Sequence, residues 1–178
     1  FTKLEIEKFM QWYDQLKNIK FVALRYFNAV GYDADGDIRG KEINSQNLLP
    51  IIMEVLSGKR SELKIFGNDY PTPDGTCIRD YIHVSDLASA HVLALEKLAQ
   101  GMASQSLNLG TGKGTSVKEM VEAVEKVSGR KVPVVYAPRR AGDPAILIAS
   151  ADKARSLLGW KPAYTDICKI VQTVYNIN

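Results

Sequence analysis

Arginine and asparagine side chains follow several apolar segments of this sequence, where ligand-binding loops are common. Arg79 lies beside Asp80, Arg139 and Arg140 stand together before a glycine–proline turn, and Asn28 directly follows a run of strand-forming residues. The planar guanidinium group suits bidentate recognition of phosphate. The alternatives are a solvated pair at Arg79 and a solvated basic turn at Arg139. Residue types alone favour a solvated pair at Arg79. At Arg139 and Arg140 they favour phosphate recognition and a solvated basic turn equally.

A glycine-rich turn at residues 110–116 invites a phosphate-loop interpretation, because amides at a helix N-terminus attract anions. Its spacing matches neither the dinucleotide-binding nor the phosphate-binding glycine pattern, so we expect a plain strand-to-helix turn. His83 and His91 are too far apart in sequence to share a metal-binding face. We expect packed or partly exposed rings and assign no metal site.

The composition is that of an ordinary soluble globular protein, with 178 residues, 46% of them hydrophobic. The net charge is only +3 and the basic residues are scattered, which argues against nucleic-acid binding. No apolar run approaches the roughly 20 residues of a membrane span, and the first residues do not resemble a signal peptide. Cys77 and Cys168 form no recognisable pair, so we expect a cytoplasmic location.

The elements that must position these residues alternate between helix and strand, which predicts an α/β protein. Helical spacing of apolar residues covers 3–17, 48–56, 84–98, a segment from 116, 152–158 and 166–175. Strand-forming runs cover 19–27, 63–66, 106–109, 132–136 and 146–149. The run 19–27 is of the kind that is buried on both faces of a parallel sheet. The polar loop at 28–43 is long enough to be functional.

Helix starts are predicted at two places by capping residues. Ser85 or Asp86 is expected to cap the helix that follows residue 83, and Ser116 with Glu119 forms a capping box. The sequence begins at Phe1 directly inside a helical apolar pattern, without a methionine or a clear cap. We therefore expect further residues to precede it.

Five segments carry a resemblance to a known family: residues 24–31, 47–50, 65–84, 106–112 and 139–144. Together they resemble the C-terminal half of the UDP-glucose 4-epimerases, within the extended short-chain dehydrogenase/reductase family. The segment 65–84 through Arg79 and Asp80 is close to diagnostic. The segments around Asn28 and His83 recur in related nucleotide-sugar dehydratases, decarboxylases and uronate epimerases.

The resemblance implies the C-terminal part of an extended Rossmann-type dehydrogenase fold, lacking the N-terminal NAD-binding strands, with a smaller α/β substrate-binding domain. Residues 1–27 and 79–103 would belong to the Rossmann NAD-binding domain. Residues 28–78 and 104–178 would form the UDP-sugar domain. It also implies a homodimer in the complete enzyme, in which the apolar helix face of residues 4–16 would be interface as well as core.

The activity implied by the resemblance is interconversion of UDP-glucose and UDP-galactose, by NAD-dependent oxidation and re-reduction at C4. In the family a tyrosine four residues before a lysine takes the C4 hydroxyl proton. Lys3 matches that lysine, as a catalytic and NAD-contacting residue, but the tyrosine would precede Phe1. The NAD-binding glycine motif is also missing, so we expect this chain alone to be inactive.

The resemblance assigns contacts around the diphosphate to two kinds of group. Asn28 and Asn47, with the backbone at Leu48, would hydrogen-bond it, and Arg79 and Arg140 would neutralise it. Burying a diphosphate without cations is costly, which gives two converging arginines a physical purpose.

The remaining assignments concern the base, the sugars and the cofactor. Phe66 would pack on the uracil ring while the backbone near Lys64 reads its edge, and Asp143 would accept from ribose hydroxyls. Leu147 would line the pocket for the hexose 2-substituent, which leaves acceptance of N-acetylated sugars open. Tyr26 would lie on the NAD side.

Two alternatives stay open. One is another nucleotide-sugar epimerase, dehydratase or decarboxylase on the same scaffold, against which the segment 66–79 argues. The other is a non-catalytic UDP-sugar-binding module.

Overall fold

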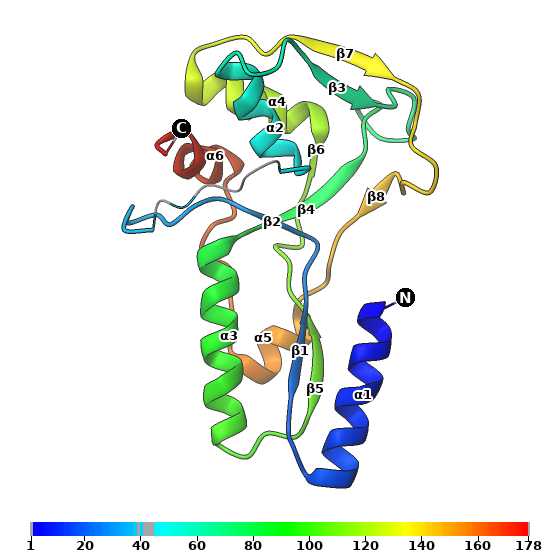
Figure 1. The fold of residues 1–178 in the computed structure, drawn as a ribbon, viewed down its shortest axis with the longest axis vertical. Coiled ribbons are helices and arrows are strands. Elements are labelled where there is room, and N and C mark those ends of the chain that lie inside the picture. The colour runs from blue at the N-terminus through cyan, green and yellow to red at the C-terminus, as the bar shows by residue number, and fades with distance from the viewer. Residues whose placement is uncertain (1, 39, 41–44, 178) are drawn as a thin grey trace.

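The computed structural model describes residues 2–38, 40 and 45–177. Its elements in chain order are α1 (Thr2–Lys17), β1 (Val22–Arg25), β2 (Asn28–Val30), α2 (Leu48–Leu56), β3 (Leu63–Phe66), β4 (Ile78–His83), α3 (Val84–Ala99), β5 (Gln105–Asn108), β6 (Gly114–Ser116), α4 (Val117–Ser128), β7 (Val134–Ala137), β8 (Ile146–Leu147), α5 (Asp152–Leu158) and α6 (Ile167–Tyr175). Figure 1 shows an elongated molecule with α2, α4, α6, β3 and β7 at one end and α1, α3, α5, β1 and β5 at the other.

The end that holds β1 and β5 is built on their parallel pairing, in which Val22 lies opposite Gln105. The helices α3 and α5 pack against these strands around a cluster that includes Leu107 and Trp160. The expected burial of residues 19–27 on both faces is wrong: Val22 to Leu24 are only half-buried and Ile19 is exposed. The reason is that, among the described residues, β1 has β5 as its only strand neighbour.

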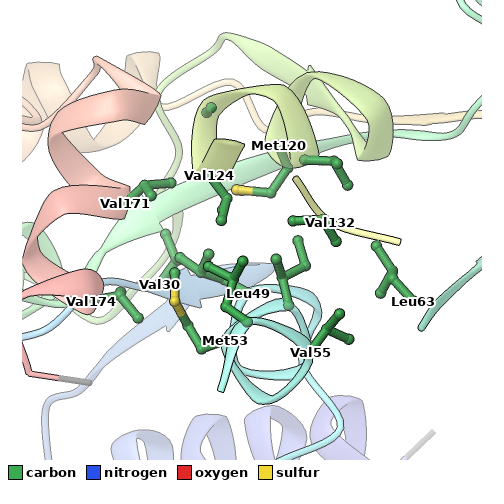
Figure 2. Close-up of a cluster of buried hydrophobic side chains, with 14 of the residues drawn as sticks. Val30, Leu49, Met53, Val55, Leu63, Met120, Val124, Val132, Val171 and Val174 are labelled. Atoms are coloured by element: carbon green, nitrogen blue, oxygen red, sulfur yellow. The ribbon is translucent and has the colours of Figure 1, made fainter. Parts of the chain in front are cut away.

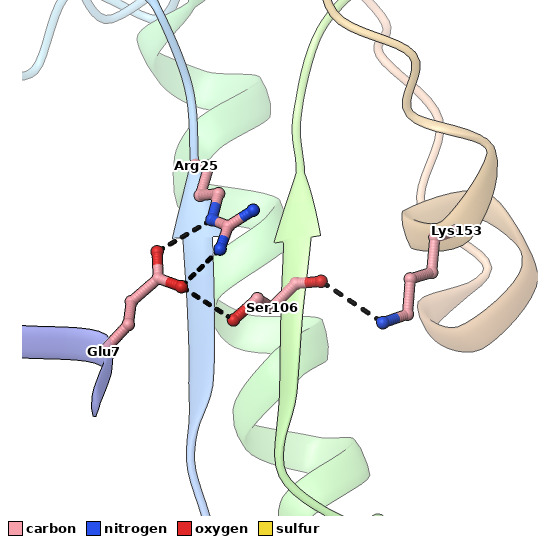
Figure 3. A network of polar contacts seen from close by, with 4 residues as sticks. All are labelled: Glu7, Arg25, Ser106 and Lys153. Atoms are coloured by element: carbon pink, nitrogen blue, oxygen red, sulfur yellow. Dashed lines mark hydrogen bonds and ion pairs between the residues drawn. The ribbon is translucent and has the colours of Figure 1, made fainter. Parts of the chain in front are cut away.

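The helix α1 is held against this sheet by polar contacts, since none of its residues, all of which the structure describes, is buried. One carboxylate oxygen of Glu7 accepts from Arg25 Nε at 2.7 Å, and the other accepts from Arg25 and from the Ser106 hydroxyl (Figure 3). The Arg25 hydrogen bond lowers the pKa of the Glu7 carboxyl. The helix also exposes large apolar side chains: Leu4, Ile6, Phe9, Trp12, Tyr13 and Leu16.

The opposite end has the larger apolar core, shown in Figure 2, where α2, α4 and α6 meet. Leu49 of α2, Met120 of α4 and Val171 of α6 are almost completely buried in it. The parallel pair of β3 and β7 closes one side, with Leu63 opposite Val134. This core holds the first turn of α2 and the strand β3 in fixed positions beside one another.

The central strand β4 connects the two ends. It pairs in parallel with β2 and β8 and antiparallel with β6. The pairing places Asn28 opposite Tyr81, and Arg79 opposite both Thr115 and Leu147. None of β2, β4 and β6 is among the strands predicted from the sequence: the run 19–27 contains one strand, β1, and β2 begins at Asn28, in the stretch predicted to be a loop.

Helix caps agree with the predictions at one place and differ at another. The Ser116 capping box is confirmed: its hydroxyl accepts from the Glu119 N–H at 3.0 Å and its own N–H donates to the Glu119 carboxylate at 2.7 Å. The expected Ser85 or Asp86 cap is wrong, because His83 caps α3 by accepting from the Ser85 N–H. The Asp86 carboxylate is buried and accepts from the backbone N–H groups of residues 163 and 164 instead.

Within the described part of the chain, no helix is both long enough and apolar enough to cross a membrane. Both Cys77 and Cys168 are free thiols.

Candidate functional site

A cavity of about 770 Å³ opens where β3, β4 and the first turn of α2 meet. It brings together eight of the nine residues predicted to contact substrate: Asn28, Asn47, Leu48, Lys64, Phe66, Arg79, Arg140 and Asp143. These residues come from five separate stretches of the chain, so their convergence is produced by the tertiary fold.

Arg79 is fixed at the cavity wall by hydrogen bonds to the backbone. Its Nη1 donates to the carbonyl oxygens of Ile78 at 2.9 Å and Pro144 at 2.8 Å, and its Nη2 lies 3.8 Å from Asp143 Oδ1. Its side chain is 13% exposed. The interpretation of a fully solvated Arg79–Asp80 pair is therefore wrong, because β8 and the loop before it cover the guanidinium group.

The adjacent residues Arg139 and Arg140 point in different directions. Arg139 lies over the ring of Tyr70 and donates to the Asp69 carboxylate at 2.7 Å, outside the cavity. Arg140 lies over the ring of Phe66 inside the cavity, with its Cζ 3.8 Å from the ring centroid. Only Arg140 of this pair is placed to meet a ligand there.

The first turn of α2 adds neutral donors to the same wall. Asn47 precedes the helix and Leu48 begins it, and the first N–H groups of a helix have no partner within the helix. The first turn contains no acidic side chain, so the partial positive charge of the helix N-terminus is not offset there. The Asn28 amide donates to the Asp80 carbonyl oxygen at 3.0 Å, which orients its side chain.

The glycine turn at residues 110–116, predicted to be a plain strand-to-helix turn, donates hydrogen bonds to a carboxylate of the protein itself. The buried Asp80 carboxylate accepts from Thr111 N–H at 3.0 Å, Thr111 Oγ1 at 2.7 Å, Gly112 N–H at 3.1 Å and Ala149 N–H at 3.3 Å. A Cβ atom on Gly110 would lie 2.6 Å from this carboxylate. The amides that a phosphate loop would offer to a ligand are thus used by Asp80.

A second cavity of about 580 Å³ adjoins the first and shares Asn28, Asn47, Leu48 and Tyr81 with it. Tyr81 was not among the predicted site residues. Burial raises the pKa of its phenol, so the hydroxyl stays protonated and available as a donor. Its position two residues after Arg79 places both side chains on the same face of β4, which is the signal that would have identified it.

The other predicted residues lie outside these two cavities. Leu147 neighbours Arg79 across β8 and β4. Tyr26 is 40% exposed beside the His91 ring, and Lys3 is exposed on α1. Lys3 is one helical turn before Glu7, which bonds Arg25, so Lys3 and Tyr26 lie at the same end of the α1–β1 pair.

A metal site is not evident in the described residues, which contain no group of three or more histidine, cysteine, aspartate or glutamate side chains that could hold an ion. His83 is buried and stacked on the Tyr164 ring, with centroids 4.0 Å apart. His91 is exposed at the surface of α3.

The model of the NAD dependent epimerase/dehydratase family matches residues 1–110. The chain belongs to this family. Among its curated relatives, the UDP-glucose 4-epimerase of Lacticaseibacillus casei is 50% identical over 175 residues, which are 98% of this chain and 53% of the relative. The chain thus spans about half the length of the curated relatives it matches.

Solved structures of the family show the same fold. The UDP-glucose 4-epimerase of Brucella ovis, solved in complex with NAD, is 46% identical with a TM-score of 0.93, over 97% of this chain and 53% of that one. The UDP-glucose 4-epimerase of Bifidobacterium longum, solved with NAD+ and UDP, is 37% identical with a TM-score of 0.87, over 98% and 52%. The predicted Rossmann-type dehydrogenase class is confirmed, while the division into two domains stays a prediction.

Proposed function

We propose that this chain forms the UDP-sugar-binding part of a UDP-glucose 4-epimerase, which interconverts UDP-glucose and UDP-galactose by oxidation and re-reduction at C4 with NAD. The observation that carries the proposal is the convergence of Arg79, Arg140 and Phe66 in one cavity beside the first turn of α2. The relatives named above are UDP-glucose 4-epimerases, and one was solved with UDP.

The cavity offers complementary groups to each part of a uridine diphosphate. Arg79 and Arg140 supply charge-assisted donors for the diphosphate, and Asn28, Asn47 and the backbone at Leu48 add neutral ones. Phe66 offers an apolar face to the base. Asp143 is 36% exposed and its carboxylate is an acceptor for ribose hydroxyls, while the backbone at Lys64 borders the base.

We infer that the residues assigned to NAD, Lys3 and Tyr26, would belong to a partial dinucleotide site. Lys3 and Tyr26 lie at the same end of α1 and β1 with exposed side chains, and α1 is fixed to β1 by Glu7 and Arg25. NAD, when bound, supplies the hydride acceptor and donor of the reaction. The positive charge of Lys3 would hold a neighbouring hydroxyl or carboxamide, while Tyr26 would cover one side of the cofactor.

Binding of UDP to the protein, measured by calorimetry, tests the placement of the site. Arg79→Ala is expected to weaken UDP binding by about 10-fold or more, because a charge-assisted hydrogen bond is lost. Arg130→Ala removes the same charge from an exposed position outside the cavity and is the matched control. Unchanged affinity in Arg79→Ala and Arg140→Ala would refute the placement.

Product analysis with UDP-glucose on the whole natural protein tests the activity. An epimerase yields UDP-galactose, whereas a dehydratase or decarboxylase on the same scaffold would release water or carbon dioxide. A non-catalytic module would instead bind UDP as the 178-residue chain without NAD and give no product.

The assembly proposed for the whole enzyme is a cytoplasmic homodimer without nucleic-acid or membrane partners. The exposed apolar side chains of α1, including Phe9 and Trp12, support an interface on that helix, since contiguous apolar surface commonly marks one. Sedimentation of the protein with and without Trp12→Glu measures this, and a monomer in both cases contradicts it.

A further inference from the structure

Two residues proposed to contact different parts of the ligand contact each other in the structure. The Arg140 guanidinium lies over the Phe66 ring, with its Cζ 3.8 Å from the ring centroid, and both side chains line the same cavity. A uracil ring that stacks on this face of Phe66 needs the space that the guanidinium occupies. Arg140 is therefore a competitor of the base for Phe66.

Arg140 is held less firmly than the two arginines near it. Arg79 donates to two carbonyl oxygens and faces Asp143, and Arg139 is bonded to Asp69. Among the described residues no carboxylate forms an ion pair with Arg140, whose guanidinium rests on the ring alone. Its backbone carbonyl accepts from the Asp143 N–H at 3.3 Å, so the turn fixes the backbone while the side chain can rotate.

The two interactions open to Arg140 differ in strength. A cation–π contact at a partly exposed position is weak, whereas a guanidinium on a phosphate forms charge-assisted hydrogen bonds, often two at once. A ligand that carries a diphosphate therefore draws Arg140 away from Phe66 and frees the ring for the base. A nucleoside must also displace the guanidinium from the ring, but it has no phosphate to offer as a new partner.

We propose that Arg140 is a specificity-determining residue that covers the Phe66 ring until a diphosphate displaces it, so that the site discriminates against uridine and other ligands without phosphate. This inference rests on the proposed function, because it takes the cavity to be the uridine diphosphate site. Under this proposal, binding of the base and binding of the diphosphate are energetically coupled through the Arg140 side chain.

The test compares uridine, UMP and UDP as ligands of the whole natural protein, by calorimetric displacement, in wild type, Arg140→Ala and Arg130→Ala. Arg140→Ala is expected to weaken UDP binding by about 10-fold or more and to strengthen uridine binding by about 2- to 5-fold. The proposal predicts that the affinities for UDP and for uridine change in opposite directions. Arg130→Ala is expected to leave the affinities for all three ligands within about 2-fold, because it is exposed outside the cavity.

A second variant, Phe66→Leu, removes the ring for which the two groups compete. In that background Arg140→Ala is expected to leave uridine affinity unchanged while still weakening UDP. If Arg140→Ala weakens uridine as well as UDP, the guanidinium supports the base and the inference is overturned. Equal uridine affinity with and without Arg140, or undetectable uridine binding in both proteins, also overturns it, and absence of UDP binding to wild type refutes the proposed function itself.

Discussion

Asp80 and Thr111 are joined by two hydrogen bonds to a single carboxylate oxygen, one from the Thr111 N–H at 3.0 Å and one from its hydroxyl at 2.7 Å. The other oxygen accepts from Gly112 and Ala149. Asp80 thus connects β4 to the turn after β5 and to the segment before α5. The residue next to the proposed phosphate-binding Arg79 is the one that fixes the strand in place.

Replacing Asp80 by asparagine is expected to lower the free energy of unfolding by about 2–4 kcal/mol, because the amide nitrogen would face backbone N–H donors that lose their acceptor. Urea unfolding of the two proteins measures this difference. Asp152→Asn is the matched control, since its side chain is 79% exposed, and we expect a change within about 0.5 kcal/mol. Equal stability of Asp80→Asn and wild type would contradict the structural role of Asp80.

Gly110→Ala is expected to destabilise the fold by about 1–3 kcal/mol through overpacking. A Cβ atom there would lie 2.6 Å from Asp80 Oδ2 and 2.7 Å from Ala149 Cβ. At Gly40, by contrast, the described residues leave a Cβ atom open space within 4 Å, so Gly40→Ala is the control for the change of residue type. Thermal unfolding of both variants compares them, and similar midpoints would show that the turn yields without cost.

The stability of the fold is expected to fall as the pH drops below about 7, because of His83. Burial lowers the pKa of this ring below its ordinary value of 6.5, although the negative charges of Asp86 and Asp33 act to raise it. Nδ1 accepts from the Ser85 N–H, so the neutral ring carries its proton on Nε2 and donates to Thr173 Oγ1 at 3.3 Å. The unfolded chain takes up a proton near pH 6.5, before the folded one does.

The free energy of unfolding should therefore decrease between pH 7.5 and 5.5, with a slope of at most about 1.4 kcal/mol per pH unit from this group. His83→Gln is expected to remove that part of the slope and His91→Gln to keep it. Should the His83 variant fail to fold, titration of the His83 ring by NMR gives the same answer. A ring pKa at or above 6.5 is inconsistent with the expectation.

Leu147→Tyr is expected to lower activity on UDP-N-acetylglucosamine relative to UDP-glucose by about 10-fold in the whole enzyme, because a larger side chain beside Arg79 would narrow the space for the 2-substituent. Ile146→Tyr places the same ring on the opposite face of β8 and is the control. The ratio of the two initial rates is the measurement. An unchanged ratio in Leu147→Tyr would remove this residue from the hexose pocket.

Helices, strands and caps were predictable from the sequence where the residues that determine them are close together in the chain. The helix Leu48–Leu56 and the strand Leu63–Phe66 have the predicted bounds, and the Ser116 capping box depends on residues only three apart. The His83 cap was not predictable in this way. It depends on burial and on the ring tautomer, which are set by contacts with Tyr164 and Thr173 far along the chain.

The same contrast between nearby residues and long-range contacts applies to the candidate site. The resemblance identified Arg79 and Arg140, but residue types alone could not separate a ligand-binding arginine from a solvated one. The distinction depends on β8 and the loop before it covering Arg79, and on Arg139 turning outward to Asp69 while Arg140 turns to Phe66. These arrangements follow from the pairing of strands far apart in sequence, which no short pattern encodes.

The hydrogen bonds that hold β4 reach Asn28, Thr111 and Ala149, which are 52, 31 and 69 residues away from Asp80. Such contacts give the centre of the molecule a high contact order, and loops of this length must close before those contacts form. A nascent or partly unfolded chain can contain the correct helices and still have no cavity for a nucleotide. We therefore expect nucleotide binding to follow the formation of these long-range contacts, so that nucleotide affinity would report on completed folding.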